Sequence, residues 1–294
     1  MKVLIIGKNG QLGQSINKIT SSENTKEEYI FVGRSELDLS NTASISTYFK
    51  QNKFDVIINC AAYTAVDKAE SEPDLANQIN FLAVKQIAEA CEHQGAKLIH
   101  ISTDYVFDGK NHKPYIENDI TNPKNVYGST KLLGERAVQE VMPTDSAIIR
   151  TGWLYSEYGN NFVKTMIKLG DSGKEVRVIF DQIGSPTYAG DLAQAVLDII
   201  KCSHFQSKNQ HTQIFHYSNE GICSWYDFAK SIFDIENMDC KVIPIEGREW
   251  EMPAKRPYYT VLNKSKLKST YGIEIPYWQY SLRTCLRYIR ASSA

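Results

Sequence analysis

The sequence predicts an α/β fold: a doubly wound parallel sheet with a smaller mixed α/β lobe toward the C-terminus. Two observations carry this prediction. Short apolar segments alternate with amphipathic segments through the first half of the chain. Strands that are apolar on both faces are typical of a parallel sheet covered by helices on each side. Right-handed crossovers then give such a sheet its doubly wound order.

Each element of the first half follows from its local pattern. Uninterrupted aliphatic runs predict strands, and apolar residues three or four positions apart predict helices. We expect strands at residues 3–6, 29–32, 56–58, 97–101 and 147–149, and helices at residues 11–20, 43–51, 74–94 and 127–141.

The second half is less regular. We expect helices at residues 162–169, 191–200 and 225–233, a strand at 214–217, and loops at Pro244, Pro253, Pro257 and Pro276. Residues 1–150 are therefore expected to form a dinucleotide-binding domain. Residues 151–294 are expected to form mainly a substrate-binding lobe, with the segment at about 170–220 returning to the main sheet.

Composition narrows the class of protein. The chain has 294 residues, of which 42% are hydrophobic, enough for a sizeable core. Its net charge of −1 gives no electrostatic reason to expect nucleic acid or a membrane surface as partner. No apolar run approaches the ~18–20 residues of a membrane span. The six cysteines are scattered without metal-ligand spacing, so we expect reduced thiols in a cytoplasmic protein and no metal site.

A glycine-rich loop follows the first expected strand. Gly7, Gly10 and Gly13 have the spacing G-x-x-G-x-x-G, and a helix is expected directly after them. Such glycines permit a tight turn, close approach of a pyrophosphate, and close packing of helix on strand. The loop therefore predicts a Rossmann dinucleotide site on the helix N-terminus, with Asn9, Gln11 and Leu12 as further contacts.

The residues that follow the second and third expected strands indicate which dinucleotide binds. The acidic residue that usually contacts the ribose 2′-hydroxyl is absent after the second strand, where Arg34 stands. An arginine there pairs with a 2′-phosphate and favours NADPH, with NADH possible; a solvated surface arginine is the alternative. We expect Asp38 and Leu39 beside the adenine. Small residues after the third strand predict further cofactor contacts at Ala61, Ala62 and Tyr63.

Tyr127 and Lys131 are the strongest candidates for chemistry. They lie four residues apart, so they share one face of the expected helix. A nearby lysine cation stabilises a phenolate and brings the tyrosine into range as an acid or base. Thr103 ends another strand, where such sheets bind ligands, and is expected to bond the substrate oxygen.

The chain resembles the dTDP-4-dehydrorhamnose reductase family of extended short-chain dehydrogenases/reductases. The resemblance spans most of the sequence, and the Ala-Val-Asp-Lys-Ala-Glu and Ser-Thr-Asp-Tyr-Val-Phe strings are far more specific than the glycine loop. The matching segments lie at residues 7–13, 56–72, 102–107, 125–128, 150–155, 159–162, 181–187 and 256–257.

The resemblance implies that hydride passes from NADPH or NADH to the C4 ketone of dTDP-4-dehydro-β-L-rhamnose while Tyr127 donates a proton. The product, dTDP-β-L-rhamnose, is a precursor of surface polysaccharide. By the same motifs, the residues that contact the dTDP-sugar are Thr103, Asp104, Trp153, Asn161 and Arg256.

The sequence also departs from the family. Some members have a carboxylate-built Mg²⁺ site at a dimer interface, but Ser15 and Gly190 stand where two of its glutamates are expected. Hard cations prefer charged oxygen ligands, so Mg²⁺ is doubtful, and we expect a monomer or weak homodimer. Tyr258, Tyr259 and Thr260 replace the smaller polar residues expected after the Arg-Pro pair.

Other functions stay open. A 4,6-dehydratase is disfavoured because Tyr105 follows Asp104 where a second carboxylate is needed. A reductase or epimerase acting on another dTDP-4-keto-deoxysugar fits the same residues. A non-catalytic dinucleotide-binding regulatory subunit, like the β subunit of methionine adenosyltransferase, is the alternative from another class.

Overall fold

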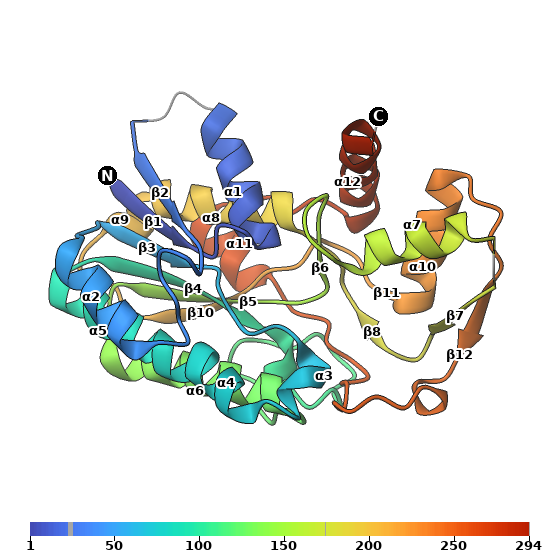
Figure 1. Cartoon of the computed structure of the whole chain (residues 1–294), viewed down its shortest axis with the longest axis horizontal. Helices are drawn as coiled ribbons and strands as arrows, with labels where there is room; N and C mark the ends of the chain where they lie inside the picture. The colour runs from blue at the N-terminus through green and yellow to red at the C-terminus, as the bar shows by residue number, and fades with distance from the viewer. Residues whose placement is uncertain (23–25, 174, 294) are drawn as a thin grey trace.

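The main sheet has six parallel strands and lies in the left half of Figure 1. The computed structural model describes residues 1–22, 26–173 and 175–293. From one edge to the other the strands are β2 (Glu28–Val32), β1 (Lys2–Ile6), β3 (Val56–Asn59), β4 (Lys97–Thr103), β5 (Ser146–Thr151) and β10 (Gln213–His216). All five pairings are parallel. The expected α/β fold with a doubly wound sheet is confirmed.

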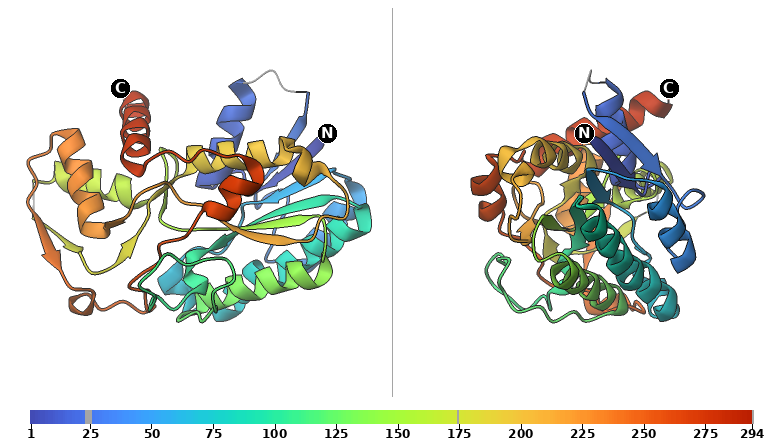
Figure 2. Two further views of the ribbon diagram at one scale, coloured as in Figure 1. Left: turned by 180° about the vertical axis from the view of Figure 1, so that it is seen from behind. Right: turned by 90° about the vertical axis from the view of Figure 1, so that its left-hand side faces the viewer.

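Helices cover both faces of this sheet (Figure 2). Alternate residues of β1 divide between the faces: Val3 and Ile5 belong to one apolar core, and Leu4 and Ile6 to the other. The first core is shared with α1 (Gln11–Ser22), α8 (Ala189–Lys201), α9 (Ser203–Gln206) and α11 (Ser265–Tyr271). The second is shared with α2 (Thr42–Gln51), α5 (Ala83–Gln94) and α6 (Val126–Val141).

The expectation of one continuous α-helix at residues 74–94 is wrong in one respect. The structure has α4 (Pro73–Asn77), then a π-helical turn at Gln78–Leu82, then α5. A π turn widens the helix by one residue and often marks a functional site. It turns the buried side chain of Asn80 toward the loop after β3.

The rest of the second half forms a lobe beside the sheet (Figure 1). Its helices are α7 (Phe162–Asp171), α10 (Trp225–Glu236) and α12 (Trp278–Ser293), which share one apolar core. Three pairs of short strands complete it: β6 (Leu154–Tyr155) with β9 (Thr187–Tyr188), β7 (Val176–Ile179) with β12 (Val242–Ile245), and β8 (Ile183–Gly184) with β11 (Cys223–Ser224). These pairs, α11 and α12 are additions to the elements expected from the sequence.

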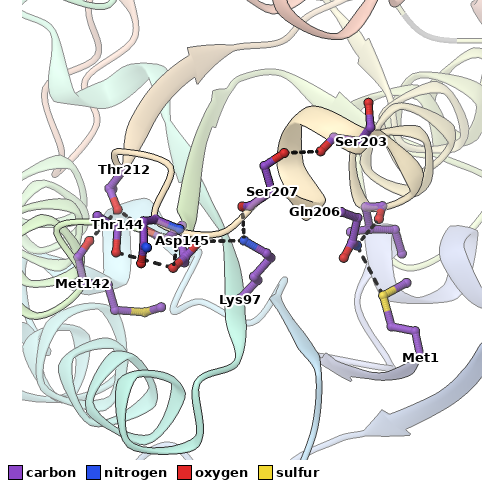
Figure 3. Close-up of polar contacts among 12 residues, drawn as sticks. Met1, Lys97, Met142, Thr144, Asp145, Ser203, Gln206, Ser207 and Thr212 are labelled. Carbon is purple, nitrogen blue, oxygen red and sulfur yellow. Dashed lines mark hydrogen bonds and ion pairs between the residues drawn. The ribbon is translucent and has the colours of Figure 1, made fainter.

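The amino end of the sheet is closed by polar contacts (Figure 3). The Lys97 ammonium, at the start of β4, donates to the Asp145 carboxylate at 2.6 Å and to the Ser207 carbonyl oxygen at 2.8 Å. These contacts join β4, the turn before β5 and the end of α9. None of the candidate site residues takes part in them, so the functional site lies elsewhere. Among the described residues, no helix has the length and apolar character needed to cross a membrane.

Candidate active site

The strand order reverses between β1 and β3, at whose carboxyl ends doubly wound sheets bind ligands, and β4 is the next strand beside them. At the end of β1, Gly7 has a φ of 99°, a left-handed value that favours glycine. A β-carbon added to Gly13 would lie only 2.3 Å from the Gly7 carbonyl oxygen. The glycines therefore allow α1 to begin directly against β1, with its first N–H groups at the sheet edge.

The side chains of this loop are held by the protein itself. The Gln11 amide reaches into the second lobe, donating to the Leu154 carbonyl oxygen and accepting from Ser156 and Asn161. Leu12 is buried in the core. The amide of Asn9 lies against the backbone of Gly33. The loop therefore offers a ligand mainly its backbone.

Arg34 and Asp38 lie near the end of β2. The Arg34 guanidinium is exposed and forms a loose ion pair with Asp38 at 3.5 Å. Asp38 also accepts hydrogen bonds from the backbone and hydroxyl of Ser40. Leu39, by contrast, is packed in the core. A second cation is close by, since the side chain of Lys8 borders Gly33 and its ammonium pairs with Glu36 at 2.6 Å.

The segment after β3 is clamped by two asparagines. The Asn59 carboxamide oxygen accepts from the Ala61 N–H at 3.1 Å, and the Asn80 oxygen accepts from the Tyr63 N–H at 2.8 Å. The Asn80 amide nitrogen donates to the Tyr63 carbonyl and, at 3.2 Å, to the Thr130 hydroxyl on α6. Asn80 thus connects the expected cofactor segment, which includes Ala62, to the helix that carries Tyr127.

Tyr127 and Thr103 come together. Tyr127 lies in the first turn of α6, which begins at the Asn125 cap, and its phenol is placed beside the Thr103 hydroxyl at the end of β4. Burial raises the pKa of the Tyr127 phenol to about 12, and the interaction with Thr103 opposes that rise. The edge of its ring meets Tyr105 with centroids 5.5 Å apart. A phenol in this state is protonated at neutral pH and able to donate.

Lys131 lies on the same helix face but is fully buried. Its ammonium donates to the Ile101 carbonyl oxygen at 2.6 Å and lies 3.4 Å from His100 Nε2. Burial lowers the pKa of Lys131 to about 8. The sequence predicts that this lysine lowers the pKa of Tyr127, but in the structure burial of the phenol raises that pKa instead.

Asp104 follows Thr103 and is also buried. Burial raises the pKa of its carboxyl to about 6, against hydrogen bonds from Thr260 and Thr103. A β-carbon on Gly152 would collide with this carboxylate at 2.5 Å, so the glycine makes room for it. Thr260, one of the residues that departs from the family pattern, therefore takes part in the site.

An aromatic cavity of about 250 Å³ opens beside Tyr105 and contains one of the expected substrate contacts, Arg256. The Arg256 guanidinium makes two bonds of 2.6 Å to the Asp67 carboxylate, at the start of α3 (Val66–Ala69). Trp225 forms part of the cavity wall, and Trp153 stacks on it with centroids 3.5 Å apart. Trp153 has a φ of 52°, an uncommon conformation for a bulky residue that often occurs at functional sites.

Asn161 lies apart from the cavity lining. Its carboxamide oxygen caps α7 by accepting from the Lys164 N–H, and its nitrogen donates to Gln11 and to the Ser156 and Tyr158 carbonyl oxygens. The whole amide is thus engaged within the protein. In the structure Asn161 holds the loop after β6 against the glycine loop, and its expected contact with substrate stays a prediction.

A buried ion pair supports α6, the helix that carries Tyr127 and Lys131. Glu135, one turn beyond Lys131, forms a bidentate pair with Arg150 of β5, and both side chains are almost fully buried. Glu135 also accepts from Ser102, the residue before Thr103. The pair therefore joins α6 to two strand ends.

Three residues that the sequence did not single out have clear places in the site: Asp67, Asn80 and His100. Asp67 lies within the Ala-Val-Asp-Lys-Ala-Glu string, but its partner is 189 positions away. Asn80 and His100 have no local signal, because a single polar residue in an apolar element acquires meaning only from its neighbours in space. Over the ranges that the structure describes, no group of three or more His, Cys, Asp or Glu side chains is placed to hold a metal ion.

Comparisons with known proteins agree with this geometry. The family model described as the RmlD substrate binding domain matches residues 1–291. A dTDP-4-dehydrorhamnose reductase of Sinorhizobium fredii is 41% identical, with 96% of each chain covered. A solved dTDP-4-dehydrorhamnose reductase of Clostridium acetobutylicum superposes with a TM-score of 0.92 and 44% identity, covering 99% of this chain and 100% of the other.

A third comparison concerns the dinucleotide. The solved dTDP-4-dehydrorhamnose reductase of Bacillus anthracis, described in complex with NADP, is 39% identical with a TM-score of 0.90, covering 98% of this chain and 99% of the other. The family match extends over nearly the whole chain, and the relatives share its full length as well as its fold. The chain therefore belongs to the family of the RmlD substrate binding domain.

Proposed function

We propose that the protein reduces the C4 ketone of dTDP-4-dehydro-β-L-rhamnose to dTDP-β-L-rhamnose with NADPH, as a step in polysaccharide biosynthesis. The observation that carries the proposal is the placement of the Tyr127 phenol beside the Thr103 hydroxyl at the carboxyl end of β4. It places two hydroxyls side by side where a doubly wound sheet presents its ligands. The identity of the substrate is inferred from the full-length relatives, which are named dTDP-4-dehydrorhamnose reductases.

The glycine loop fits a dinucleotide. A β-carbon on Gly13 would lie 2.3 Å from the Gly7 carbonyl oxygen, so glycine at this position lets α1 begin directly against the loop. The N–H groups of the first turn of α1 would then bind a pyrophosphate. The exposed Arg34 would bind a 2′-phosphate, and the Ala61–Tyr63 backbone would line the ribose. When bound, NADPH supplies the hydride.

The protein's own groups handle the proton. Tyr127 holds a proton at neutral pH because burial raises the pKa of its phenol. Thr103 orients this phenol and would bond the same substrate oxygen. Tyr127 then donates its proton as negative charge develops on that oxygen.

The cavity beside Tyr105 suits a nucleotide sugar. Its wall is aromatic at Trp225 and Trp250, and Arg256 brings a guanidinium to its rim. Aromatic faces bind a base, and guanidinium bonds diphosphate oxygens in pairs. Trp153 would contact the sugar from its stacked position on Trp225, and Asp104 would bond the sugar beside Thr103.

The test is a reductase assay with purified protein and dTDP-4-dehydrorhamnose, in which the loss of NADPH absorbance and the formation of dTDP-rhamnose are both followed. We expect NADPH to be consumed in a one-to-one ratio with product. Conversion of the sugar without consumption of NADPH would indicate an epimerase, and no conversion with retained NADPH binding would indicate a regulatory subunit.

The finer properties are also proposals. We propose a cytoplasmic protein, a monomer or weak homodimer, with a boundary between the dinucleotide-binding and substrate-binding parts near residue 150. Light scattering across a range of protein concentrations, with and without Mg²⁺, tests the state of association. A stable dimer that dissociates when Mg²⁺ is removed would contradict it.

A further inference from the structure

His100 is a buried titratable residue to which the reaction proposed above assigns no role. It lies on β4, three residues before Thr103, with no exposed surface. Its ring bridges two polar side chains: Nδ1 lies 3.3 Å from the Asn59 amide nitrogen, and Nε2 lies 3.4 Å from the Lys131 amine. A buried imidazole placed in this way influences the lysine according to which ring nitrogen carries the hydrogen.

The neighbouring backbone determines that tautomer. The Ala61 N–H donates to Asn59 at 3.1 Å, and because a backbone N–H is only a donor, the atom facing it is the carboxamide oxygen. The Asn59 nitrogen therefore faces His100, and an amide nitrogen only donates. His100 Nδ1 must accept this bond, so in the neutral ring Nε2 carries the hydrogen.

This hydrogen faces Lys131. An ammonium has no lone pair to accept it, whereas a neutral amine has one. One Lys131 hydrogen is already given to the Ile101 carbonyl oxygen at 2.6 Å, which fixes the amine in place. The contact with His100 is therefore attractive only when Lys131 is neutral. Two other groups affect the charge of Lys131, Glu135 on α6 and Cys60 after β3, and both favour the ammonium.

We propose that His100 is a positioning residue that donates its Nε2 hydrogen to the neutral amine of Lys131 and so favours release of a lysine proton toward Tyr127. The inference rests on the proposed roles of Tyr127 and Lys131. After Tyr127 has given its proton to the substrate oxygen, a proton leaves Lys131 and ends on the phenolate. The electron pair stays on the lysine nitrogen and accepts from His100, so no oxidant or reductant is needed.

The tautomer is measured directly in the wild-type protein without substrate. The chain has six histidines, and ¹⁵N labelling of histidine separates protonated from unprotonated ring nitrogens by chemical shift. We expect one buried histidine, assigned by its loss in His100→Asn, to be protonated at Nε2 alone at neutral pH. Protonation at Nδ1, or at both nitrogens, would overturn the proposal.

The effect on Lys131 is measured with ¹³C-labelled lysine, its signal being assigned by loss in Lys131→Met. In His100→Asn the shorter side chain still meets Asn59 but does not reach Lys131, and we expect the lysine titration midpoint to rise by about half a pH unit or more. In His100→Gln an amide N–H again reaches the amine, and the midpoint should return toward wild type. Equal midpoints in wild type and His100→Asn, or equal shifts in both variants, would show a purely structural role.

A third variant changes the tautomer without altering His100. In Asn59→Asp a carboxylate still accepts from Ala61 but has no hydrogen for Nδ1, so the imidazole must move its hydrogen to Nδ1 and offer Nε2 as an acceptor. We expect the Lys131 midpoint to rise further than in His100→Asn, and a lower or unchanged midpoint would contradict the proposal. These titrations need no turnover, so their failure is distinguishable from a failure of the reductase assay.

Discussion

Tyr127 shows how burial and hydrogen bonding compete for one proton. Burial keeps the phenol protonated, and the bond with Thr103 opposes that effect. In Tyr127→Phe the proton is lost while the ring still packs on Tyr105, so we expect kcat to fall by at least ~10²-fold. NADPH affinity should stay within about twofold, measured by fluorescence titration. Tyr48→Phe, on the distant helix α2, is the matched control, and unchanged turnover in Tyr127→Phe would refute the proposed acid.

Arg34 bears on the choice between NADPH and NADH. Its guanidinium is exposed, and its ion pair with Asp38 is long enough at 3.5 Å to be exchanged readily. A charged bond to a 2′-phosphate contributes about 1.5–3 kcal/mol, so Arg34→Ala should raise the KM for NADPH at least tenfold and that for NADH less than twofold. Steady-state kinetics with both cofactors measure this. Equal increases in the KM values for NADPH and NADH would indicate that Arg34 does not contact the 2′-phosphate.

Asp67 holds Arg256, the proposed contact to the substrate diphosphate. Its carboxylate holds the guanidinium by two short bonds at the rim of the cavity. In Asp67→Asn the arginine loses its bidentate partner, and we expect the KM for the dTDP-sugar to rise several-fold with kcat nearly unchanged. Initial rates at varied sugar concentration test this, with the exposed Asp74→Asn as control. A fall in kcat alone would place Asp67 in the chemical step instead.

At the scale of elements, α6 depends on the buried pair of Glu135 and Arg150. Removing one member of a buried ion pair leaves an uncompensated charge and costs about 3–5 kcal/mol. We therefore expect Glu135→Gln to lower the free energy of unfolding by about this amount, measured by urea denaturation. Glu140→Gln, on the exposed side of the same helix, should change it by less than ~0.5 kcal/mol. A similar small effect for Glu135→Gln would contradict the assignment.

The elements also show what local sequence can and cannot predict. The inner strands of the main sheet were predictable because most of their residues form apolar runs buried on both faces, as Val3–Ile6 illustrates. The helix α12 was also predictable in principle, since Trp278, Leu282, Cys285 and Leu286 repeat at helical spacing along its buried face. The strand pair β7 and β12 was not, because each has four residues and its partner lies more than sixty positions away.

The same distinction holds within the site. Gly7, Gly13, Tyr127 and Lys131 could be identified because their spacing is local and their chemistry depends on that spacing. The pairing of Arg256 with Asp67 could not, since it joins residues that are far apart in the chain. The raised pKa of Tyr127 was also missed, because local sequence shows the nearby lysine but gives no measure of burial. The catalytic, cofactor and substrate roles of all these residues stay predictions.

At the scale of the whole molecule, buried His216 makes the free energy of unfolding depend on pH. Burial and the nearby charges of Arg150 and Lys266 lower its pKa to about 3, well below the value of ~6.5 in an unfolded chain. Below pH ~6.5 the unfolded chain takes up a proton on this histidine that the folded protein does not. The contribution of neutral, buried His216 to the free energy of unfolding is therefore lost as the pH falls toward 3.

The effect is isolated by comparison with His216→Gln. The difference in unfolding free energy between wild type and this variant should shrink by about 1.4 kcal/mol per pH unit between pH ~6 and ~4. Urea denaturation at several pH values measures it. The buried Asp104, whose raised pKa acts in the opposite direction, is present in both proteins and therefore cancels. A difference that is constant with pH would mean that His216 is protonated in the folded protein.

Gln11 has a consequence for how the enzyme meets its ligands. One amide at the start of α1 joins the nucleotide loop to Leu154, Ser156 and Asn161 of the neighbouring lobe. A hinge motion at this place would have to break three hydrogen bonds together, each contributing about 0.5–1.5 kcal/mol. The glycine loop and this part of the lobe are thus held together by the protein itself, so we expect both ligands to meet a preassembled arrangement in which only individual side chains and loops adjust.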